Sequence, residues 1–307
     1  MGKRIGWIVA VVSLVIGVSA ITVYNKLTSF EVEHVSGDVY VIYGLGGNVG
    51  VLSTGRGTVV VDTMTFNLQG KRIREQAQQI GGAPVTTIIN THYHIDHTHG
   101  NPAFPMGTRV VSTDRTLAYL RTRDADYWEG DASRTLPNET FEDEHVMRIG
   151  GKTIRLYHLG RGHTDGDLVV LFTDDRVLHT GDLFFNGRYP NIDLEAGGSV
   201  QEWSSTIDRI LELDFDKVIP GHGPVTDRQG LISFQRFMRE LADVAARAAA
   251  KGLSLDETLA TANLKEDEGY EAMSIPFVMN LDRDFVIRRA WEEATGAVKP
   301  TSLPSSR

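Results

Sequence analysis

The feature that most constrains the fold is the segment "NTHYHIDHTHG", residues 90–100. It follows the apolar, β-branched run "VTTII" and holds four of the ten histidines of the 307-residue chain, together with one aspartate. A loop at the end of a strand is a place where side chains from one segment converge. Imidazole and carboxylate groups bind zinc, and a catalytic zinc site keeps one position open for water. The segment therefore predicts a metal site at the end of a buried strand.

The rest of the chain supplies matching ligands in matching positions. In an extended segment, His92 and His94 point to the same side, with Asp96 following, and a turn into a helix would bring His97 to the same point. Three further candidates lie in loops that follow or join predicted strands: His163 in "GRGHTDGD", Asp182 in "HTGDLFF" and His222 in "VIPGHGPVT". We expect one edge of a sheet to gather all seven residues into one pocket.

Two arrays of strands and helices are predicted around these loops. In the first, short β-branched runs at 39–43, 49–53 and 58–61 form an antiparallel meander, and a helix over 66–80 ends at Gly81. In the second, "TIRLYHL", "DLVVLF", "RVLHT" and "DKVIP" are strands, and a helix over 199–214 opens with a capping box of Ser199 and Glu202. Helical spacing continues from Leu231, with a second capping box at 254–257 and a last helix ended by Gly296.

The ligand set resembles that of the metallo-β-lactamase superfamily of binuclear metallohydrolases, and the similarity runs from about Val39 to about Val225. The resemblance implies an α/β fold, a four-layer αβ/βα sandwich, here with a helical C-terminal extension. Asp62 in "VVVDTM" is similar to the family's buried aspartate, which supports the metal loop. We therefore divide the chain into an N-terminal leader (1–26), a metallo-β-lactamase-like domain (30–227), a helical extension (228–297) and a frayed tail (298–307).

The same resemblance implies the chemistry. His92, His94 and His163 would hold one Zn²⁺, and Asp96, His97 and His222 would hold the other; Asp182 would bridge them. Iron and manganese are the alternative metals. Two such ions share a hydroxide that acts near neutral pH, and Asp96, as the catalytic residue, would orient it and shuttle its proton. The expected reaction is hydrolysis of an ester, lactone, thioester or amide, β-lactams included, in a small molecule.

Departures from individual relatives narrow the choice of reaction. Lactamases whose second zinc has a Cys ligand carry it where this chain has Asp182, and their substrate-gripping Lys corresponds to Phe185. These differences argue against β-lactam hydrolysis by that route, although Arg188 could replace the missing cation. Diiron oxygen reductases have Glu in place of His94. A glyoxalase II-type thioesterase and a non-heme iron oxidoreductase are the alternatives within the superfamily, and a non-catalytic, membrane-anchored metal-binding domain is the alternative outside enzymes.

Two segments are candidates for the mouth of the site. The polar insert Arg121–Phe141 contains Trp128 and has the length of a lid or recognition loop, with a solvated surface loop as the alternative. The segment after Asp182 places Arg188 and Tyr189 close to the metal ligands in sequence. An anionic substrate would suit Arg188.

Composition and the N-terminus bear on partners and location. A net charge of −9 leaves no broad cationic surface for nucleic acid, and the absence of cysteine excludes thiolate zinc sites and a Cys nucleophile. Lys3 and Arg4 precede an apolar run from Ile5 to Tyr24. A run of about 20 such residues is long enough to span a bilayer. It predicts either a cleaved signal peptide or a membrane anchor, and so a protein in the periplasm or on the outer face of the inner membrane.

The other histidines are expected to be ordinary residues. We assign His34, His145, His158 and His179 to the surface or the core, and His99 to a helix surface or to the support of the metal loop.

Overall fold

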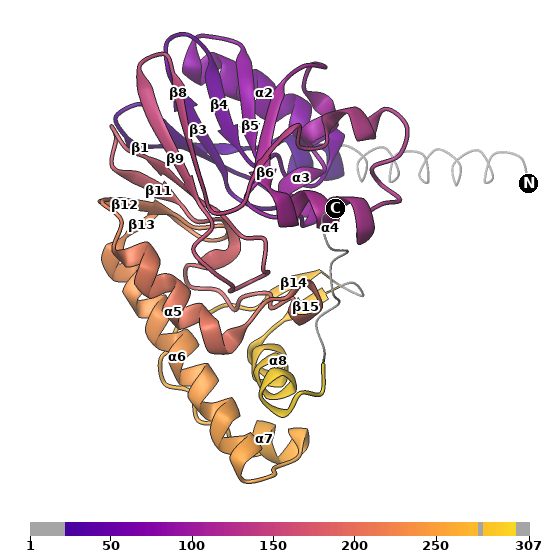
Figure 1. Cartoon of the computed structure of the whole chain (residues 1–307), viewed down its shortest axis with the longest axis vertical. Coiled ribbons are helices and arrows are strands. Elements are labelled where there is room, and N and C mark those ends of the chain that lie inside the picture. The colour runs from indigo at the N-terminus through magenta and orange to yellow at the C-terminus, as the bar shows by residue number, and fades with distance from the viewer. Residues whose placement is uncertain (1–21, 276–278, 299–307) are drawn as a thin grey trace, which may run out of the picture.

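The computed structural model describes residues 22–275 and 279–298. Two β-sheets face one another, and helices cover the outer surface of each (Figure 1). This arrangement confirms the predicted four-layer αβ/βα sandwich. The predicted leader lies outside the described residues as far as residue 21, and so does the predicted tail from residue 299. In the described ranges no helix combines the length and apolarity needed to cross a membrane.

The first sheet contains seven strands in sequence order: β1 (Glu31–Ser36), β2 (Val39–Tyr43), β3 (Val49–Ser53), β4 (Thr58–Val61), β5 (Val85–Ile89), β6 (Arg109–Thr113) and β7 (Glu139–Phe141). Strands β1 to β4 form an antiparallel meander, as predicted for β2 to β4, and β4 to β7 are parallel. Parallel neighbours end at the same edge, so the loops after β4 and β5 open side by side.

The second sheet has the order β13 (Thr226–Asp227), β12 (Lys217–Ile219), β11 (Val177–His179), β10 (Val169–Phe172), β9 (Lys152–Tyr157) and β8 (Glu144–Ile149). Strands β11 and β12 are parallel, and the other neighbours are antiparallel. The four strands predicted in this half are present. The loops that follow β11 and β12 therefore leave the same edge of the sheet.

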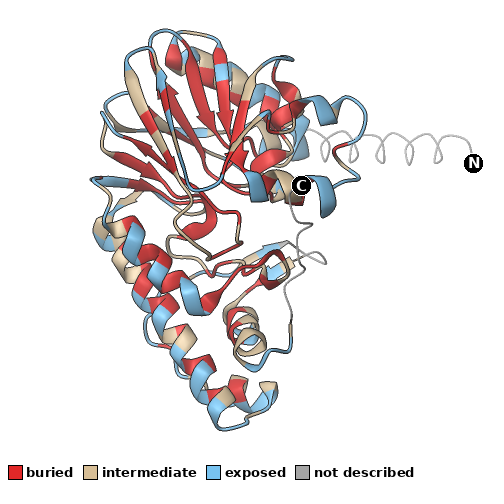
Figure 2. Cartoon of the chain, viewed as in Figure 1, coloured by how far each residue is buried: buried red, intermediate tan, exposed pale blue. Residues whose placement is uncertain are grey.

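One apolar core lies between the sheets. Val61 and Ile89 of the first sheet and Leu156 and Val170 of the second are fully buried in one cluster. Figure 2 shows the same concentration of buried residues along the strands. Burying one such side chain stabilises the fold by about 1.5–3 kcal/mol. The loops at the sheet edges are therefore attached to strands that tight packing holds in place.

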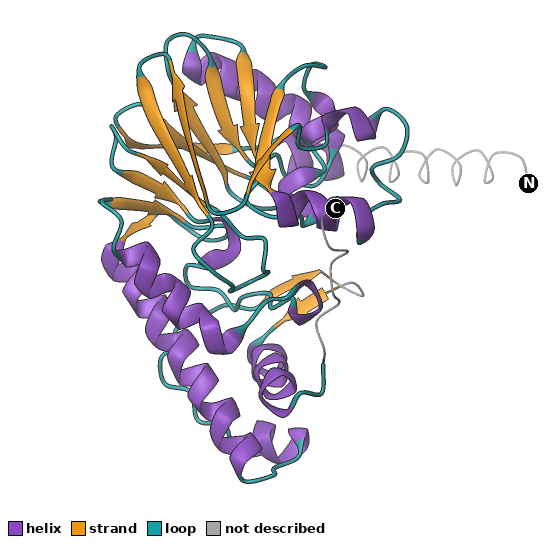
Figure 3. Ribbon diagram, in the orientation of Figure 1, coloured by secondary structure: helices purple, strands orange, loops and turns teal. Residues whose placement is uncertain are grey.

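Helices close the two outer surfaces. Helix α2 (Asn67–Gly81) packs on the first sheet through Ile73 and Ala77. Helices α5 (Val200–Leu211), α6 (Arg228–Ala250) and α8 (Arg283–Thr295) lie together on the side of the second sheet (Figure 3). Their buried side chains form a third apolar cluster with that sheet, and Trp203 is fully buried in it. The helices of the C-terminal segment are thus part of the packed molecule. The same segment also contains α7 (Leu255–Thr261) and the hairpin of β14 (Met273–Ile275) and β15 (Met279–Leu281).

Helix ends follow the predicted signals with two corrections. Gly82, with φ of 62°, and not Gly81, is the C-cap of α2. The hydroxyl of Ser199 caps α5 by accepting the backbone N–H of Glu202, but the carboxylate of Glu202 binds Arg161 and so does not complete the predicted capping box. The capping box that begins at Ser254 is present, and Gly296 ends α8 as predicted.

Candidate metal centre

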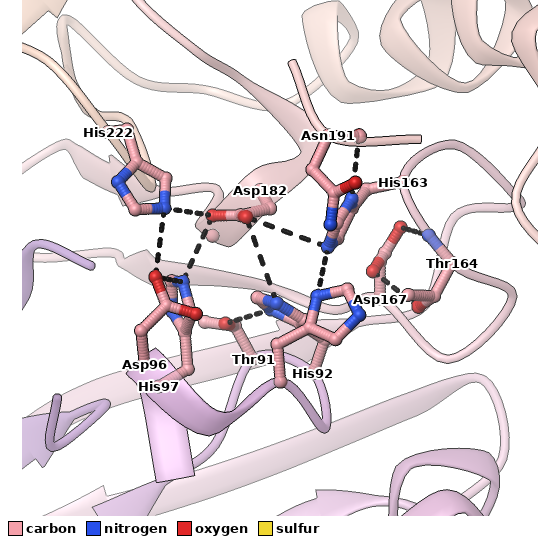
Figure 4. A network of polar contacts seen from close by, with 12 residues as sticks. Thr91, His92, Asp96, His97, His163, Thr164, Asp167, Asp182, Asn191 and His222 are labelled. Atoms are coloured by element: carbon pink, nitrogen blue, oxygen red, sulfur yellow. Dashed lines mark hydrogen bonds and ion pairs between the residues drawn. The ribbon is translucent and has the colours of Figure 1, made fainter. Parts of the chain in front are cut away.

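All seven predicted ligands meet at one end of the sandwich. Their donor atoms form two groups, and within each group the atoms lie within 4.8 Å of one another. The first group is His92, His94, His163 and Asp182, and the second is Asp96, His97 and His222. Figure 4 shows Asp182 between His92 and His163 on one side and His97 and His222 on the other.

The loop after β5 supplies ligands to both groups. The chain is not helical at His92 and His94, and it enters the single-turn helix α3 (Ile95–Thr98) at the next residue. The extended alternation therefore ends at His94. Simple alternation predicts that Asp96 points to the same side as these two histidines. In the structure Asp96 lies with His97 in the second group.

Asp182 is the residue that faces both groups. Its Oδ2 atom lies 3.8 Å from Nε2 of His92 and 3.5 Å from Nε2 of His163. Its Oδ1 atom lies 3.2 Å from Nε2 of His97 and 3.5 Å from Nε2 of His222. With one oxygen toward each group, this buried carboxylate is placed to bridge two cations.

Unpaired polar atoms show what the site is built to hold. Among the described residues, three buried side-chain polar atoms lack a hydrogen-bond partner: Nε2 of His92, Nε2 of His97 and Oδ1 of Asp182. Leaving such an atom unpaired costs about 1–3 kcal/mol, so a cluster of them needs an explanation. Nitrogen and oxygen donors directed at a common centre are the ligands that zinc takes in catalytic sites. The residues present therefore fit the metal pair that the resemblance implies.

Asp62 supports one histidine of each group. Its carboxylate accepts the Nδ1–H of His97 at 2.7 Å. It also accepts the backbone N–H of Thr91 at 2.8 Å and the Thr91 hydroxyl at 2.7 Å, and that hydroxyl accepts the Nδ1–H of His92 at 3.1 Å. Asp62 has φ of 65°, a conformation rarely adopted by residues other than glycine. The fold maintains this strained backbone at the point where the carboxylate reaches the metal loop.

A second set of supports holds the first group, and sequence reasoning did not find it. His94 donates its Nε2–H to Asp193 at 3.0 Å, and the Tyr93 hydroxyl donates to the same carboxylate. His163 donates its Nδ1–H to the carbonyl of Asn191 at 2.9 Å. Both supports come from the irregular segment "YPNIDLEAGG". Its only sequence signal is its position, a few residues after Asp182.

Burial and the charges of neighbouring side chains shift the pKa values of the predicted ligands. Burial alone would raise the pKa of Asp182, but the imidazoles of His97 and His222 outweigh it and hold that pKa well below its usual range. Burial would lower the pKa of His222, and the carboxylates of Asp182 and Asp96 outweigh it and raise the pKa to about 9. Burial, reinforced by His94, lowers the pKa of His163 to about 4. The carboxylates are thus ionised and ready to bind cations at neutral pH.

Two glycines allow the backbone to pass directly beside the ligands. A Cβ atom at Gly221 would lie 2.0 Å from Oδ1 of Asp182, and one at Gly47 would lie 2.2 Å from Cε1 of His97. Any side chain at these positions would displace a ligand.

The three proposed substrate residues are each held by an acidic partner. Arg188 pairs with Glu271 at 3.2 Å, and the Tyr189 hydroxyl donates to Asp267 at 2.9 Å. Trp128 is 5% exposed and donates its indole N–H to Asp124 at 2.7 Å. Their role in substrate binding stays a prediction.

The insert that carries Trp128 is more ordered than the predicted loop. It contains the end of α4 (Asp114–Thr122), a short 3₁₀ turn and β7. His99 supports it by pairing with Asp124 at 2.8 Å and stacking on Tyr127 at 3.5 Å between ring centroids.

The remaining histidines lie outside both groups. His34 bonds to the carbonyl of Gly37, His145 pairs with Glu139, and His158 bonds to the carbonyl of Asp167. His179 is fully buried and bonds to the carbonyl of Asn48 at 3.2 Å.

Comparison with known proteins agrees with this geometry. The family model for the metallo-β-lactamase superfamily matches residues 42–222, more than half of the chain. A metallo-β-lactamase type 2 from Bacillus sp. (strain 170) is 27% identical over 69% of this chain and 83% of its own length. The 2,4-dinitroanisole O-demethylase subunit alpha from Nocardioides sp. (strain JS1661) is 27% identical over 83% of this chain and 75% of its own length. Among solved structures, a double mutant of the sec-alkyl sulfatase PisA1 has a TM-score of 0.69, with 18% identity over 87% of this chain and 50% of that chain.

The chain belongs to the metallo-β-lactamase superfamily. It is a metal-dependent hydrolase, in agreement with the ligand groups that the fold brings together.

Proposed function

We propose that this protein is an exported hydrolase that uses two zinc ions to cleave an ester, lactone, thioester or amide bond of a small molecule. The observation that carries the proposal is the placement of Asp182, with one carboxylate oxygen toward each ligand group and unpaired atoms on both sides. When bound, the two ions would polarise the scissile bond and lower the pKa of a water molecule at the site.

Asp96 is the residue best placed to handle the proton of that water. Its side chain is 30% exposed, whereas His97 beside it is fully buried. Burial would raise the pKa of Asp96, but His97 and His222 outweigh it and hold the pKa below its usual range. An ionised and accessible carboxylate accepts a hydrogen bond from the attacking water and then receives its proton. The chain therefore needs no side-chain nucleophile.

The neighbourhood of Asp96 favours a substrate with an apolar part. The β2–β3 loop reaches the second group, where Gly47 donates its backbone N–H to the carbonyl of Asp96 at 3.1 Å. Leu45 in this loop and Ile95 beside Asp96 are both exposed. Exposed apolar side chains next to a polar site are typical of ligand-binding surfaces.

The test combines metal content with a substrate panel. We expect elemental analysis of the purified chain to find about two zinc ions, because a catalytic zinc takes three protein ligands and one water. The panel should contain a chromogenic ester, a lactone, a cephalosporin and a glutathione thioester. The names of the similar proteins add an aryl methyl ether and an alkyl sulfate.

Matched variants separate chemistry from folding. Asp182→Asn should abolish turnover and lower the zinc content, whereas Arg176→Ala, at the β10–β11 turn, should leave both unchanged. One iron and no zinc would favour the oxidoreductase alternative. Two zinc ions with no turnover of any panel member would favour the non-catalytic, membrane-anchored alternative.

Export is the second part of the proposal, and it rests on the N-terminal sequence alone. If residues 5–24 are an anchor, the protein should stay in the membrane fraction, and protease added to spheroplasts should remove the domain. If they are a signal peptide, a soluble periplasmic form should begin near Ile21. A domain that is protected in intact spheroplasts would refute export.

A further inference from the structure

Three consecutive residues, 191 to 193, connect the first ligand group to the C-terminal helix α8. The carbonyl of Asn191 accepts the Nδ1–H of His163 at 2.9 Å, and the carboxylate of Asp193 accepts the Nε2–H of His94 at 3.0 Å. The backbone N–H of Asp193 also donates to the carbonyl of His163 at 3.1 Å. Between them, the carbonyl of Ile192 accepts Nε–H of Arg289 at 2.9 Å. One arginine of α8 therefore holds the peptide that separates the supports of two ligands.

Arg289 is itself held rigidly. Its side chain is 12% exposed, and its guanidinium also pairs with Glu292 at 2.7 Å and with Glu195. A planar guanidinium with several fixed partners gives directed hydrogen bonds that lysine cannot reproduce. Val286, Ile287 and Ala290 of α8 are buried in the cluster shared with α5 and α6, so the helix cannot shift freely.

A second residue of α8, Glu293, binds the chain at the start of α5, which begins shortly after Asp193. The carboxylate of Glu293 accepts the Ser199 hydroxyl at 2.6 Å and the backbone N–H groups of Val200 and Gln201 at 2.8 and 3.2 Å. Ser199 donates its backbone N–H to the carbonyl of Gly162, the residue before His163, at 2.8 Å. Contacts with α8 thus hold the chain on both sides of Asp193, at Ile192 and at Ser199.

The second ligand group is supported by Asp62, which it shares with the first group, and by the backbone of Asn186. Asp62, directly after β4, orients His97, and the carbonyl of His222 accepts the backbone N–H of Asn186 at 2.9 Å. Neither support comes from α8. The two groups share Asp62, which also supports His92 through Thr91, but α8 contacts the supports of the first group alone.

We infer that Arg289 and Glu293 of α8 are positioning residues that set the metal affinity of the first group, through His94 and His163, and leave the second group unaffected. The inference rests on the proposed function, because it assumes that both groups bind metal. It assigns a role in the metal site to a helix that begins more than sixty residues after the last ligand, His222.

The test measures each group separately. His222→Ala disables the second group and His163→Ala disables the first, and zinc is titrated into each chelator-treated protein in competition with a chromophoric chelator. In the His222→Ala background, Arg289→Ala should weaken zinc binding about 10–100-fold, the usual cost of losing a support of a metal ligand. In the His163→Ala background the change should stay under about threefold, well below that cost.

A neighbour on the same helix provides the control. Arg288 is exposed, so Arg288→Ala removes the same charge and should change neither affinity. Arg289→Lys keeps the charge but loses the planar fork and should give an intermediate loss in the first group alone. Should Arg289→Ala not fold, Arg289→Lys and Glu293→Gln carry the same comparison. The same variants are also loaded with Co²⁺ in place of zinc. Arg289→Ala should change the Co²⁺ absorption spectrum in the His222→Ala background, where the first group binds the ion, and should leave the spectrum in the His163→Ala background unchanged.

The outcomes are distinct. Equal losses in both backgrounds would mean that α8 supports only the fold, and no loss in the His222→Ala background would mean that it does not position the ligands; either result overturns the inference. If the parent protein takes up no zinc at all, the proposed function fails as well. If the parent protein binds two zinc ions and the Arg289→Ala variant binds them equally well, the inference is refuted and the proposed function is not.

Discussion

Asp62→Ala is the substitution with the most calculable effect on the site. Its carboxylate receives three hydrogen bonds, from the backbone and hydroxyl of Thr91 and from His97, and all of these atoms are buried. Removing one partner of a buried charged pair costs about 3–5 kcal/mol, because the remaining group is left without a partner. We therefore expect the free energy of unfolding of the chelator-treated protein to fall by about 3–5 kcal/mol. Urea denaturation followed by circular dichroism measures this change.

Metal binding should fall at both groups in the same variant. Asp62 orients His97 directly and His92 through Thr91, so one histidine of each group loses its fixed orientation. Each stepwise zinc affinity should weaken about 10–100-fold. Asp62→Asn tests the orientation of His97 more finely: its carbonyl can still accept the Thr91 N–H, but its NH₂ cannot accept the proton of His97. It should lose less stability than Asp62→Ala while still weakening the second group.

Asp175→Ala is the matched control. This buried carboxylate at the β10–β11 turn likewise holds several donors, namely Lys152 and the backbone N–H of Asp38. The variant should lose stability and keep both zinc affinities. The reasoning about Asp62 is refuted if Asp62→Ala unfolds like the parent, or if it binds zinc no more weakly than Asp175→Ala does.

Three further predictions address the fit of the site, the core and the pH response. Gly221→Ala should expel metal from both groups, because its Cβ would lie 2.0 Å from Asp182; Gly252→Ala, which meets nothing within 4 Å, should leave the zinc content unchanged. Trp203→Ala should reduce the free energy of unfolding by about 3–5 kcal/mol, as for other fully buried aromatic residues. A loss below about 1 kcal/mol in urea denaturation would show that the neighbouring side chains fill the space left by Trp203 without cost. Burial lowers the pKa of His179 to about 4, so its neutral form contributes stability above the unfolded-state pKa of about 6.5, and this contribution is lost as the pH falls toward 4. His179→Gln should flatten the pH dependence of unfolding between these values in chelator-treated protein, and an unchanged slope would contradict the assignment.

Six of the seven ligands were predictable because they follow one of three short strands, and His163 was predicted from its place in a glycine-rich loop between two strands. All five residues of "VTTII" are β-branched, and "RVLHT" and "DKVIP" each contain two adjacent apolar residues. The structure places the residues after these strands at one end of the sandwich. Strands β1 and β8 were not predicted, because "EVEHVS" and "EHVMRI" mix charged and apolar residues. Four of the six residues of β1 and three of the six residues of β8 are exposed. Strand β7 has three residues, as β11 and β12 have, but its sequence "ETF" contains a single apolar residue.

Helix caps show why local signals fail where distant groups compete. Ser199 and Glu202 have the spacing of a capping box, but Arg161 from the loop before His163 takes the carboxylate of Glu202. Glu293, far along the chain, then supplies the acceptor at the start of α5. Both Arg161 and Glu293 are too far along the chain from Ser199 for a local sequence pattern to include them. The chain therefore forms the helix that the signal predicts with a cap that the signal does not.

The supports of the site are less readable than its ligands for the same reason. A zinc ligand must be a His, an Asp, a Glu or a Cys, and here the ligands lie in loops next to strands, which limits both residue type and position. A support needs only a polar atom at the correct point, and the carbonyls of Asn191 and Ile192 meet that need whatever their side chains are. The sequence therefore predicts where a metal binds better than how tightly it binds. That tightness depends on contacts such as Arg289 to Ile192, which form only when the C-terminal helices pack on the second sheet.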